Sequence, residues 1–259
     1  LVTATMAKNA REGIDFFPLT VDYREKTYAA GKIPGGYFKR ESRPGERETL
    51  ICRLIDRPIR PLFPKAFKNE TQIISLVISH DQDNSPDVIS IIGASAALLI
   101  SDIPFEIPIA GVRVGRIDGN FVLNPTLKEI EKSDINLIMA GTQDGIVMVE
   151  SGSEEVSEEV MMDCLEYGHE YIKKIIALQI ELKKSLGKEK IPLVELEVDE
   201  ALKTRVEEKS TPDLKEAMKI SGKHERQDVI DKIKSSLIEE LGSEEDPNLN
   251  DQIKSFFGS

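Results

Sequence analysis

The chain has 259 residues, of which 40% are apolar and 31% are charged, and its formal net charge is −12. These values are typical of a globular protein with one large domain or two smaller ones, and the negative charge argues against general coating of nucleic acid. No apolar run approaches the roughly 18 residues of a membrane span, so we expect no membrane partner.

The two cysteines and three histidines are scattered along the chain. Cys52 and Cys164 lie in apolar helical contexts, so we expect buried thiols and a cytoplasmic location rather than a disulfide. The spacing of cysteines and histidines does not match a zinc site. Asp81 and Asp83 lack the regular spacing of a calcium loop and are interpreted as part of a solvated turn.

Strands and helices alternate in the first hundred residues. Strand patterns cover residues 1–7, 19–23 and 72–79, and helical patterns cover residues 49–57 and 87–100. Pro58 and Pro61 are expected to end the first helix, and small residues in the second helix favour close packing on a sheet. Because the chain opens inside a strand pattern, we expect it to be part of a longer protein.

Two hairpins and a long helix are predicted next. The paired strands are expected at 109–117 with 121–123, and at 135–140 with 146–149. Asp118-Gly119-Asn120 forms the first turn, because Asp-Gly tolerates positive φ, and the second turn lies near Gly145. Residues 157–186 form an amphipathic helix with acidic residues early and lysines late, as the helix dipole favours.

The composition changes after residues 187–192. Strand patterns fade, and charge-rich helical segments follow, punctuated by glycine and proline. We therefore predict an α+β core followed by an all-α helical domain. The expected parts are the N-terminal part of the core at 1–105, its C-terminal part with the long helix at 106–188, and the helical domain at 189–259.

The stretch from Lys32 to Lys68 is a basic island, with ten basic residues against four acidic ones. On an acidic chain, such an island predicts a dedicated anion site. Within it, Tyr37-Phe38-Lys39-Arg40 follows a glycine pair, and rings beside cations are typical of surfaces that hold single-stranded nucleic acid. The alternative is a loop whose rings are buried and whose cations are merely solvated.

Three arginines follow in and after the predicted helix. Arg53 and Arg57 are one turn apart, and Arg60 falls near the same edge if the turn continues. Guanidinium groups in a row can bind successive phosphates in a bidentate manner. The alternative is pairing with Asp56 or a nearby glutamate, which we expect to occupy one arginine rather than all three.

Several motifs, in order along the chain, resemble the polynucleotide phosphorylase family. They lie at 16–36, 37–40, 54–64, 92–97, 122–125, 140–142 and 148–151, and the third begins Leu-Ile-Asp-Arg-Pro-Ile-Arg-Pro. The resemblance covers roughly residues 1–186 and is weaker from about residue 190 onward. It implies a first RNase PH-like core, which is of the βαβα type and ribosomal-protein-like, followed by a helical linker domain.

The resemblance also implies an activity. In this family, inorganic phosphate attacks the 3′-terminal phosphodiester of single-stranded RNA and releases nucleoside diphosphates, with magnesium as cofactor. Three chains form a homotrimeric ring around an RNA channel, and RNA-degradation complexes are further partners. The residues implied to grip RNA are Tyr37, Phe38, Lys39 and Arg40, supported by Arg53, Arg57 and Arg60. The family's usual loop is Phe-Phe-Arg-Arg, from which Tyr37 and Lys39 depart conservatively.

The residues argue that this core is catalytically silent. Active copies carry a Ser-rich phosphate site at the start of the sheet-packed helix, where this chain has Asn84-Ser85-Pro86-Asp87. A carboxylate there would repel a phosphate. The Asp, Asp and Lys of active copies correspond to Ile130, Asn136 and Ile138, none of which can supply a carboxylate to magnesium or a cation to phosphate. A small shift of the alignment would instead bring Asp134 into the metal position. We expect no catalytic residue or metal ligand here, and an active copy further along the longer protein.

Two other interpretations remain open. A non-catalytic RNA-binding ring subunit of an exosome-like complex would share the core and the arginines but act only as a scaffold. Such subunits usually end after the core, so the helical segments after Gly187 favour the first interpretation. A stand-alone RNase PH is the third interpretation, and the missing phosphate site argues against it.

Overall fold

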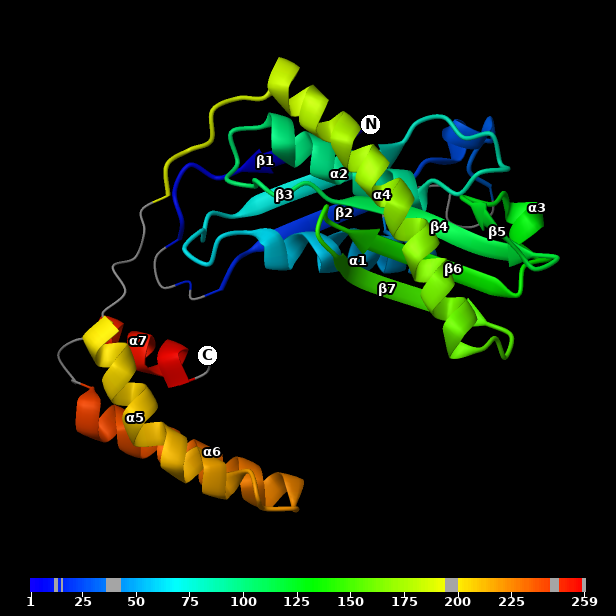
Figure 1. The fold of residues 1–259 in the computed structure, drawn as a ribbon. Coiled ribbons are helices and arrows are strands. Elements are labelled where there is room, and N and C mark those ends of the chain that lie inside the picture. The colour runs from blue at the N-terminus through cyan, green and yellow to red at the C-terminus, as the bar shows by residue number, and fades with distance from the viewer. Residues whose placement is uncertain (12–13, 15, 36–42, 194–199, 243–246, 258–259) are drawn as a thin grey trace. The chain divides into compact units, whose positions relative to one another are not determined.

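The computed structural model describes residues 1–11, 14, 16–35, 43–193, 200–242 and 247–257 (Figure 1). These residues belong to two compact units, Leu1–Val194 and Glu195–Ser259, which are described separately. The motif Tyr37-Phe38-Lys39-Arg40 lies outside the described residues.

The first unit begins with a three-stranded sheet of order β1-β3-β2. Its strands are β1 (Val2–Met6), β2 (Leu19–Glu25) and β3 (Thr71–Val77). The central strand β3 is antiparallel to β1 and parallel to β2. A parallel pair needs a crossover connection, and this one contains the short helix η1 (Thr27–Ala30), helix α1 (Glu46–Ile59) and the short helix η2 (Arg60–Leu62).

A four-stranded antiparallel sheet of order β5-β4-β6-β7 follows. Its strands are β4 (Ala110–Ile117), β5 (Asn120–Leu123), β6 (Ile135–Gly141) and β7 (Ile146–Ser153). The remaining helices of this unit are α2 (Asp87–Ile100), the short α3 (Leu127–Ile130) and α4 (Glu158–Leu186). Both predicted hairpins and the long helix are therefore present, and α4 runs across the second sheet (Figure 1).

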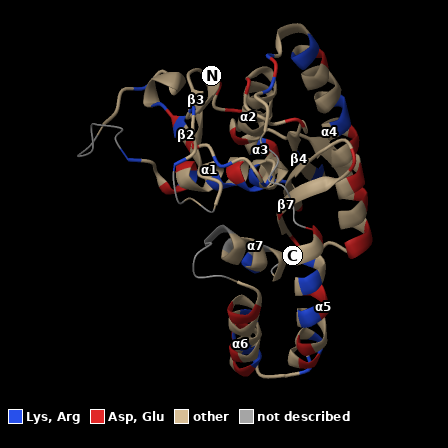
Figure 2. Cartoon of the chain, turned by 90° about the vertical axis from the view of Figure 1, so that its left-hand side faces the viewer, with Lys and Arg blue, Asp and Glu red and all other residues tan. Residues whose placement is uncertain are grey.

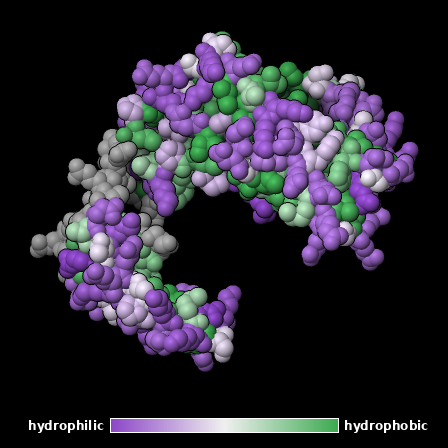
Figure 3. Space-filling model, viewed as in Figure 1, coloured by the Kyte–Doolittle hydropathy of each residue, from purple (hydrophilic) through white to green (hydrophobic). Residues whose placement is uncertain are grey.

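The second sheet separates two apolar clusters. Val112, Leu137 and Met139 pack with the buried face of α4, while Ala140 and Met148 belong to the cluster built on α1, α2 and the first sheet. Residues 110–115 of β4 are all buried, because β4 is covered on both faces. On the face seen in Figure 3, hydrophilic residues separate the apolar ones at the surface of this unit.

Small residues allow α2 to approach the first sheet closely, as expected. A Cβ atom at Gly93 would lie only 2.7 Å from a methyl carbon of Val2 on β1. The extent of α1 differs from the prediction, since Pro58 lies inside its last turn rather than beyond its end. Ile55 and Ile59 of this turn are fully buried, so packing holds the turn in helical form despite the proline.

The chain beyond α4 stays attached to the first unit through Lys190. Its ammonium group donates to three carbonyl oxygens at the C-terminal end of α2, those of Leu98, Leu99 and Ser101, at 2.8, 3.0 and 2.7 Å. Burial lowers the pKa of Lys190. Ile191 and Leu193 pack against the first core. The compact unit therefore runs to Val194 and includes residues that we had expected in the helical domain from 189 onward.

The second unit is helical in its described residues, as the charge-rich segments predicted. It contains α5 (Glu200–Ala217), α6 (Lys223–Leu241) and α7 (Pro247–Phe257). Acidic and basic residues are spread along α5 and α6 (Figure 2). Its buried apolar residues are Leu202, Val206, Leu237, Leu241 and Ile253. Across the part of the chain that the structure describes, no helix is long and apolar enough to span a membrane.

Candidate nucleic-acid interface

The exposed edge of α1 carries the first two predicted arginines. Arg53 is exposed, and among the described residues it has no hydrogen-bond or ion-pair partner. Arg57 donates to the carboxylate of Glu150 on β7 at 3.2 Å, and the two side chains are 51% and 59% exposed. Exposed pairs of this kind contribute only about 0–1 kcal/mol, so a phosphate could displace Glu150 at little cost.

Arg60 has a different environment. Its guanidinium binds the carboxylate of Asp56 through two contacts, of 3.0 and 2.6 Å. It also donates to the carbonyl oxygens of Phe17 and Leu19, each at 3.0 Å. These bonds connect the end of α1 to the segment that enters β2. Two of the three arginines are thus paired internally, where we had expected one, and Arg60 is the one whose donors are largely occupied.

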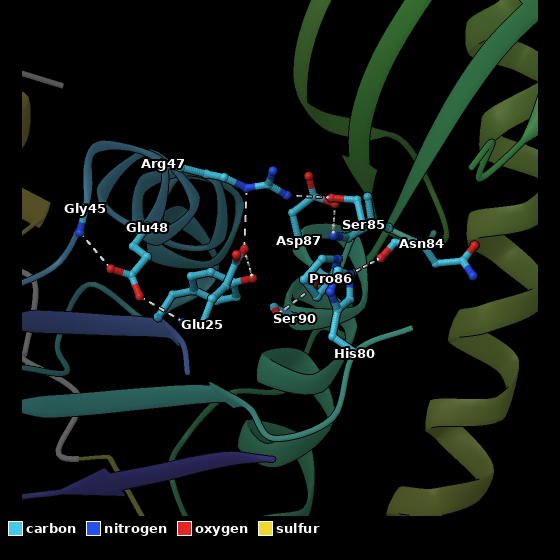
Figure 4. A network of polar contacts seen from close by, with 12 residues as sticks. Glu25, Gly45, Arg47, Glu48, His80, Asn84, Ser85, Pro86, Asp87 and Ser90 are labelled. Atoms are coloured by element: carbon cyan, nitrogen blue, oxygen red, sulfur yellow. Dashed lines mark hydrogen bonds and ion pairs between the residues drawn. The ribbon is translucent and has the colours of Figure 1, made fainter. Parts of the chain in front are cut away.

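A polar network surrounds the N-terminal turn of α1 (Figure 4). The carboxylate of Glu48 accepts from the backbone N–H of Gly45 at 2.6 Å and from that of Glu25 at 2.9 Å. Arg47 lies 3.4 Å from the Glu25 carboxylate and donates to the Ser85 hydroxyl at 3.3 Å. The sequence interpretation missed this network, because Glu25 and Glu48 are far apart in the chain.

The buried phenol of Tyr23 completes this network. Tyr23 lies on β2, is fully buried and donates to the Glu25 carboxylate at 2.7 Å. Burial raises the pKa of Tyr23, and the hydrogen bond to Glu25 raises it further. The phenol therefore remains a protonated donor that orients the Glu25 carboxylate.

A pocket of about 430 Å³ lies at the N-terminal end of α2. At its wall, Asp87 and Arg113 form an ion pair at 2.5 Å, and their side chains are only 8% and 10% exposed. The second carboxylate oxygen of Asp87 accepts from the N–H of Val88 at 2.7 Å. Arg113 also donates to the side-chain carbonyl of Asn136 on β6, while its Nε has no partner.

This ion pair changes the expected electrostatic effect of Asp87 on a phosphate. The sequence suggested a carboxylate that repels phosphate, but Arg113 compensates its charge. The sequence interpretation of Asp87 was incomplete because Arg113 lies in a different element, the apolar strand β4. Its pairing with Asp87 could not be seen in the sequence. A single arginine within the buried run 110–115 was the available signal, since a charge in such a place needs a partner.

The rim of the pocket is a tight turn. The carboxylate of Asp81 accepts from the N–H groups of Asn84 and Asp83 and from the Asn84 side chain, at 2.9, 3.0 and 2.6 Å. These hydrogen bonds lower the pKa of Asp81 to about 2. Gln82 and Asn124 have positive φ, at 68° and 47°. The carboxylate of Asp81 therefore stabilises the turn, and both Asp81 and Asp83 are exposed, as expected for a solvated turn.

The positions that correspond to the Asp, Asp and Lys of catalytically active cores do not fit a magnesium ion. Asn136 accepts from Arg113, Ile138 packs against the first core, and Asp134 lies 3.5 Å from Arg116. Throughout the described part of the chain, no group of three or more His, Cys, Asp or Glu could hold a metal. Both cysteines are free thiols, and burial raises the pKa of Cys164 to about 11.

Known protein families match segments along most of the chain. Residues 1–104 and 108–171 match domains 1 and 2 of the 3′ exoribonuclease family, and residues 201–259 match the RNA binding domain of polyribonucleotide nucleotidyltransferase. The polyribonucleotide nucleotidyltransferase of Geotalea daltonii is 54% identical over 258 residues, which cover 100% of this chain and 37% of that protein. The chain belongs to the polyribonucleotide nucleotidyltransferase family.

Other relatives agree with this membership. The polyribonucleotide nucleotidyltransferase of Bacillus subtilis is 50% identical over 255 residues, which cover 98% of this chain and 36% of that protein. This member of the polyribonucleotide nucleotidyltransferase family thus spans little more than a third of its curated relatives. The crystal structure of rice Rrp46 matches with a TM-score of 0.56 at 16% identity, covering 70% of this chain and 82% of that one, and it confirms the RNase PH-like fold.

Proposed function

We propose that this chain is the RNA-guiding part of a phosphorolytic 3′-to-5′ exoribonuclease, which degrades mRNA to nucleoside diphosphates as a polyribonucleotide nucleotidyltransferase. Its first RNase PH-like core holds single-stranded RNA and does not cleave it. The observation that carries the proposal is the exposed edge of α1, where Arg53 is unpaired among the described residues and Arg57 makes only a solvent-exposed pair.

The aromatic and basic motif belongs to the same proposal. Tyr37 and Phe38 stack on bases, and Lys39 and Arg40 neutralise phosphates, since rings and cations together bind single strands without sequence preference. The motif precedes α1 by a few residues, so the motif and the helix can contact one strand in succession. Arg60 supports RNA binding by holding the end of α1 in place.

Catalysis is assigned to another core of the longer protein. In the first core, Asp87 at the compared phosphate site and Asn136 at the compared metal site are both bound by the guanidinium of Arg113. Inorganic phosphate, nucleoside diphosphates and magnesium are accordingly expected at the other core. A homotrimeric ring, a cytoplasmic location and association with an RNA-degradation complex complete the proposal.

The test is an assay of the 259-residue chain with fluorescein-labelled oligoadenylate, in the presence of phosphate and magnesium. We expect salt-dependent binding of the oligonucleotide and no release of nucleoside diphosphate. Phosphate-dependent release of the diphosphate would contradict the silent core, and the absence of binding at low salt would contradict the RNA-guiding role. The full-length protein provides the positive control for phosphorolysis.

A second measurement distinguishes the role of Arg53 and Arg57 in RNA binding from the structural role of Arg60. Arg53→Ala combined with Arg57→Ala should lower RNA affinity and flatten its dependence on salt, because each lost phosphate contact removes about 0.7 from the slope for single strands. Arg60→Ala should mainly lower the free energy of unfolding, because its contacts are internal. An unchanged salt slope in the double variant would mean that Arg53 and Arg57 do not contact phosphate.

A further inference from the structure

We infer that Glu150 weakens the hold of this chain on RNA: its carboxylate is a resident anion that competes with an RNA phosphate for Arg57. The inference rests on the proposed phosphate contacts of Arg53 and Arg57, and it adds a residue from another element that tunes them. Glu150 lies on β7, the edge strand of the second sheet, and Arg57 lies in the last turn of α1.

The sheet itself turns Glu150 toward α1. In the antiparallel ladder between β6 and β7, Glu150 lies opposite Ile138. Side chains alternate between the two faces of a strand, so Glu150 also shares a face with Met148, two residues earlier. Ile138 and Met148 both pack in the cluster built on α1, α2 and the first sheet. The carboxylate is therefore placed beside α1 by a paired strand rather than by a loop.

The two arginines proposed to bind phosphate are unequal in the free protein. Arg57 donates to the carboxylate of Glu150 at 3.2 Å. Its neighbour Asp56 is already engaged, because both oxygens of that carboxylate are bound by Arg60. Arg53, one turn earlier on α1, has no such partner in the described part of the chain. Arg53 is therefore open to a phosphate, whereas Arg57 is already neutralised.

The exposure of the pair allows the two anions to exchange. The side chains of Arg57 and Glu150 are 51% and 59% exposed, so water surrounds the pair and its net stabilisation is small. When a phosphate binds Arg57, the Glu150 side chain can turn into solvent while its backbone stays in the ladder. The phosphate must still replace an existing partner, and it then lies near a carboxylate. Both effects oppose binding.

A weakened hold suits a surface that guides a strand, because RNA must move along it as the 3′ end is shortened. When a phosphate leaves Arg57, Glu150 returns an ionic partner to the guanidinium and so lowers the cost of release. The dependence of affinity on salt should also be shallower, because a displaced carboxylate takes up a cation while the RNA releases one. Glu150 thus favours release of the strand, in contrast to Arg53, which holds it.

The experiment compares Glu150→Gln with Glu154→Gln in the 259-residue chain. Glutamine keeps the size of the side chain but offers Arg57 a neutral acceptor, whose hydrogen bond is about half as strong. Glu154 is exposed, directly follows β7 and has no side-chain partner among the described residues. Its N–H donates to the carbonyl of Asp134 and continues the ladder, so it lies roughly 13 Å from Glu150 along the strand. That separation exceeds the Debye length of about 8 Å at physiological salt, so Glu154→Gln changes the charge without changing the pair.

We expect Glu150→Gln to bind labelled oligoadenylate about two- to fivefold more tightly, as for the loss of one exposed ionic competitor. Glu154→Gln should bind within about 1.5-fold of the wild type, since its charge is screened from Arg57. The slope of affinity against salt should steepen by up to about 0.7 in Glu150→Gln alone. Fluorescence anisotropy at several salt concentrations measures both quantities.

Arg57→Ala completes a double-mutant cycle with Glu150→Gln. If Glu150 acts through Arg57, Glu150→Gln should tighten binding clearly less when residue 57 is already alanine. An equal gain in both backgrounds would mean general repulsion of RNA and would overturn the inference, as would a Glu150→Gln variant that binds no more tightly than Glu154→Gln. If Arg57→Ala alone leaves RNA affinity and its salt slope unchanged, the proposed phosphate contact of Arg57 fails, and the inference fails with it.

Discussion

Replacing Arg113 by alanine is expected to destabilise the first unit by about 3 to 5 kcal/mol, because it leaves the carboxylate of Asp87 buried without its partner. The two side chains are only 8% and 10% exposed and lie 2.5 Å apart. The substitution also removes the donor to Asn136, so the contact between α2, β4 and β6 loses both of its polar connections. Urea unfolding followed by circular dichroism measures the effect.

The matched control is Arg116→Ala on the same strand. Arg116 pairs with Asp134 at 3.5 Å, where the side chains are 24% and 37% exposed, so water can replace the lost partner. We expect this variant to lose about 1 kcal/mol or less. The double variant Asp87→Ala with Arg113→Ala should be more stable than Arg113→Ala alone, since no charge is left unpaired. Equal losses for Arg113→Ala and Arg116→Ala would refute the role assigned to burial.

Replacing Tyr37 and Phe38 together by alanine is expected to lower the affinity for single-stranded RNA at least tenfold. Stacking of a base on an aromatic side chain contributes about 1–3 kcal/mol, and two rings are removed. No charge changes, so the slope of affinity against salt should stay the same, in contrast to the arginine variants. Fluorescence anisotropy with labelled oligoadenylate at several salt concentrations measures both quantities.

Phe16→Ala is the control for the loss of an exposed ring. Phe16 is 62% exposed and lies outside the motif, so its removal should leave RNA affinity within about twofold of the wild type. A double variant that binds RNA as tightly as the wild type would contradict stacking. It would favour the alternative in which Lys39, Arg40 and the arginines of α1 bind phosphates alone.

The order of strands and helices could be predicted from local patterns. Alternation identified β1 and β2, and the Asp118-Gly119 turn identified the first hairpin because few residues other than glycine tolerate positive φ. The acidic start and basic end of α4 placed both of its ends within a residue or so of those observed. Pro58 misled the prediction of where α1 ends, because tertiary packing of Ile55 and Ile59 outweighs the cost of the proline.

The environment of each charged residue could not be predicted in the same way. Spacing placed Arg53, Arg57 and Arg60 along one edge, but it did not show that Arg57 meets Glu150 on β7 or that Arg60 bonds the chain before β2. These partners come from other elements, and only the packing of α1 on both sheets brings them within reach. Arg60 is therefore better understood as a support of the helix than as an exposed phosphate contact.

By itself, the sequence determined the α+β core followed by helices, the basic island and the motifs that resemble its family, because these depend on local periodicity and residue type. Tertiary structure decided which charges are available and which are compensated. The sequence suggested that Asp87 would repel phosphate, but Arg113 on β4 proved to be its partner. The sequence also did not indicate that Glu48 of α1 accepts from the N–H of Glu25 on β2. The physical reason is that the free energy of a charge depends on burial and on partners that are distant in sequence.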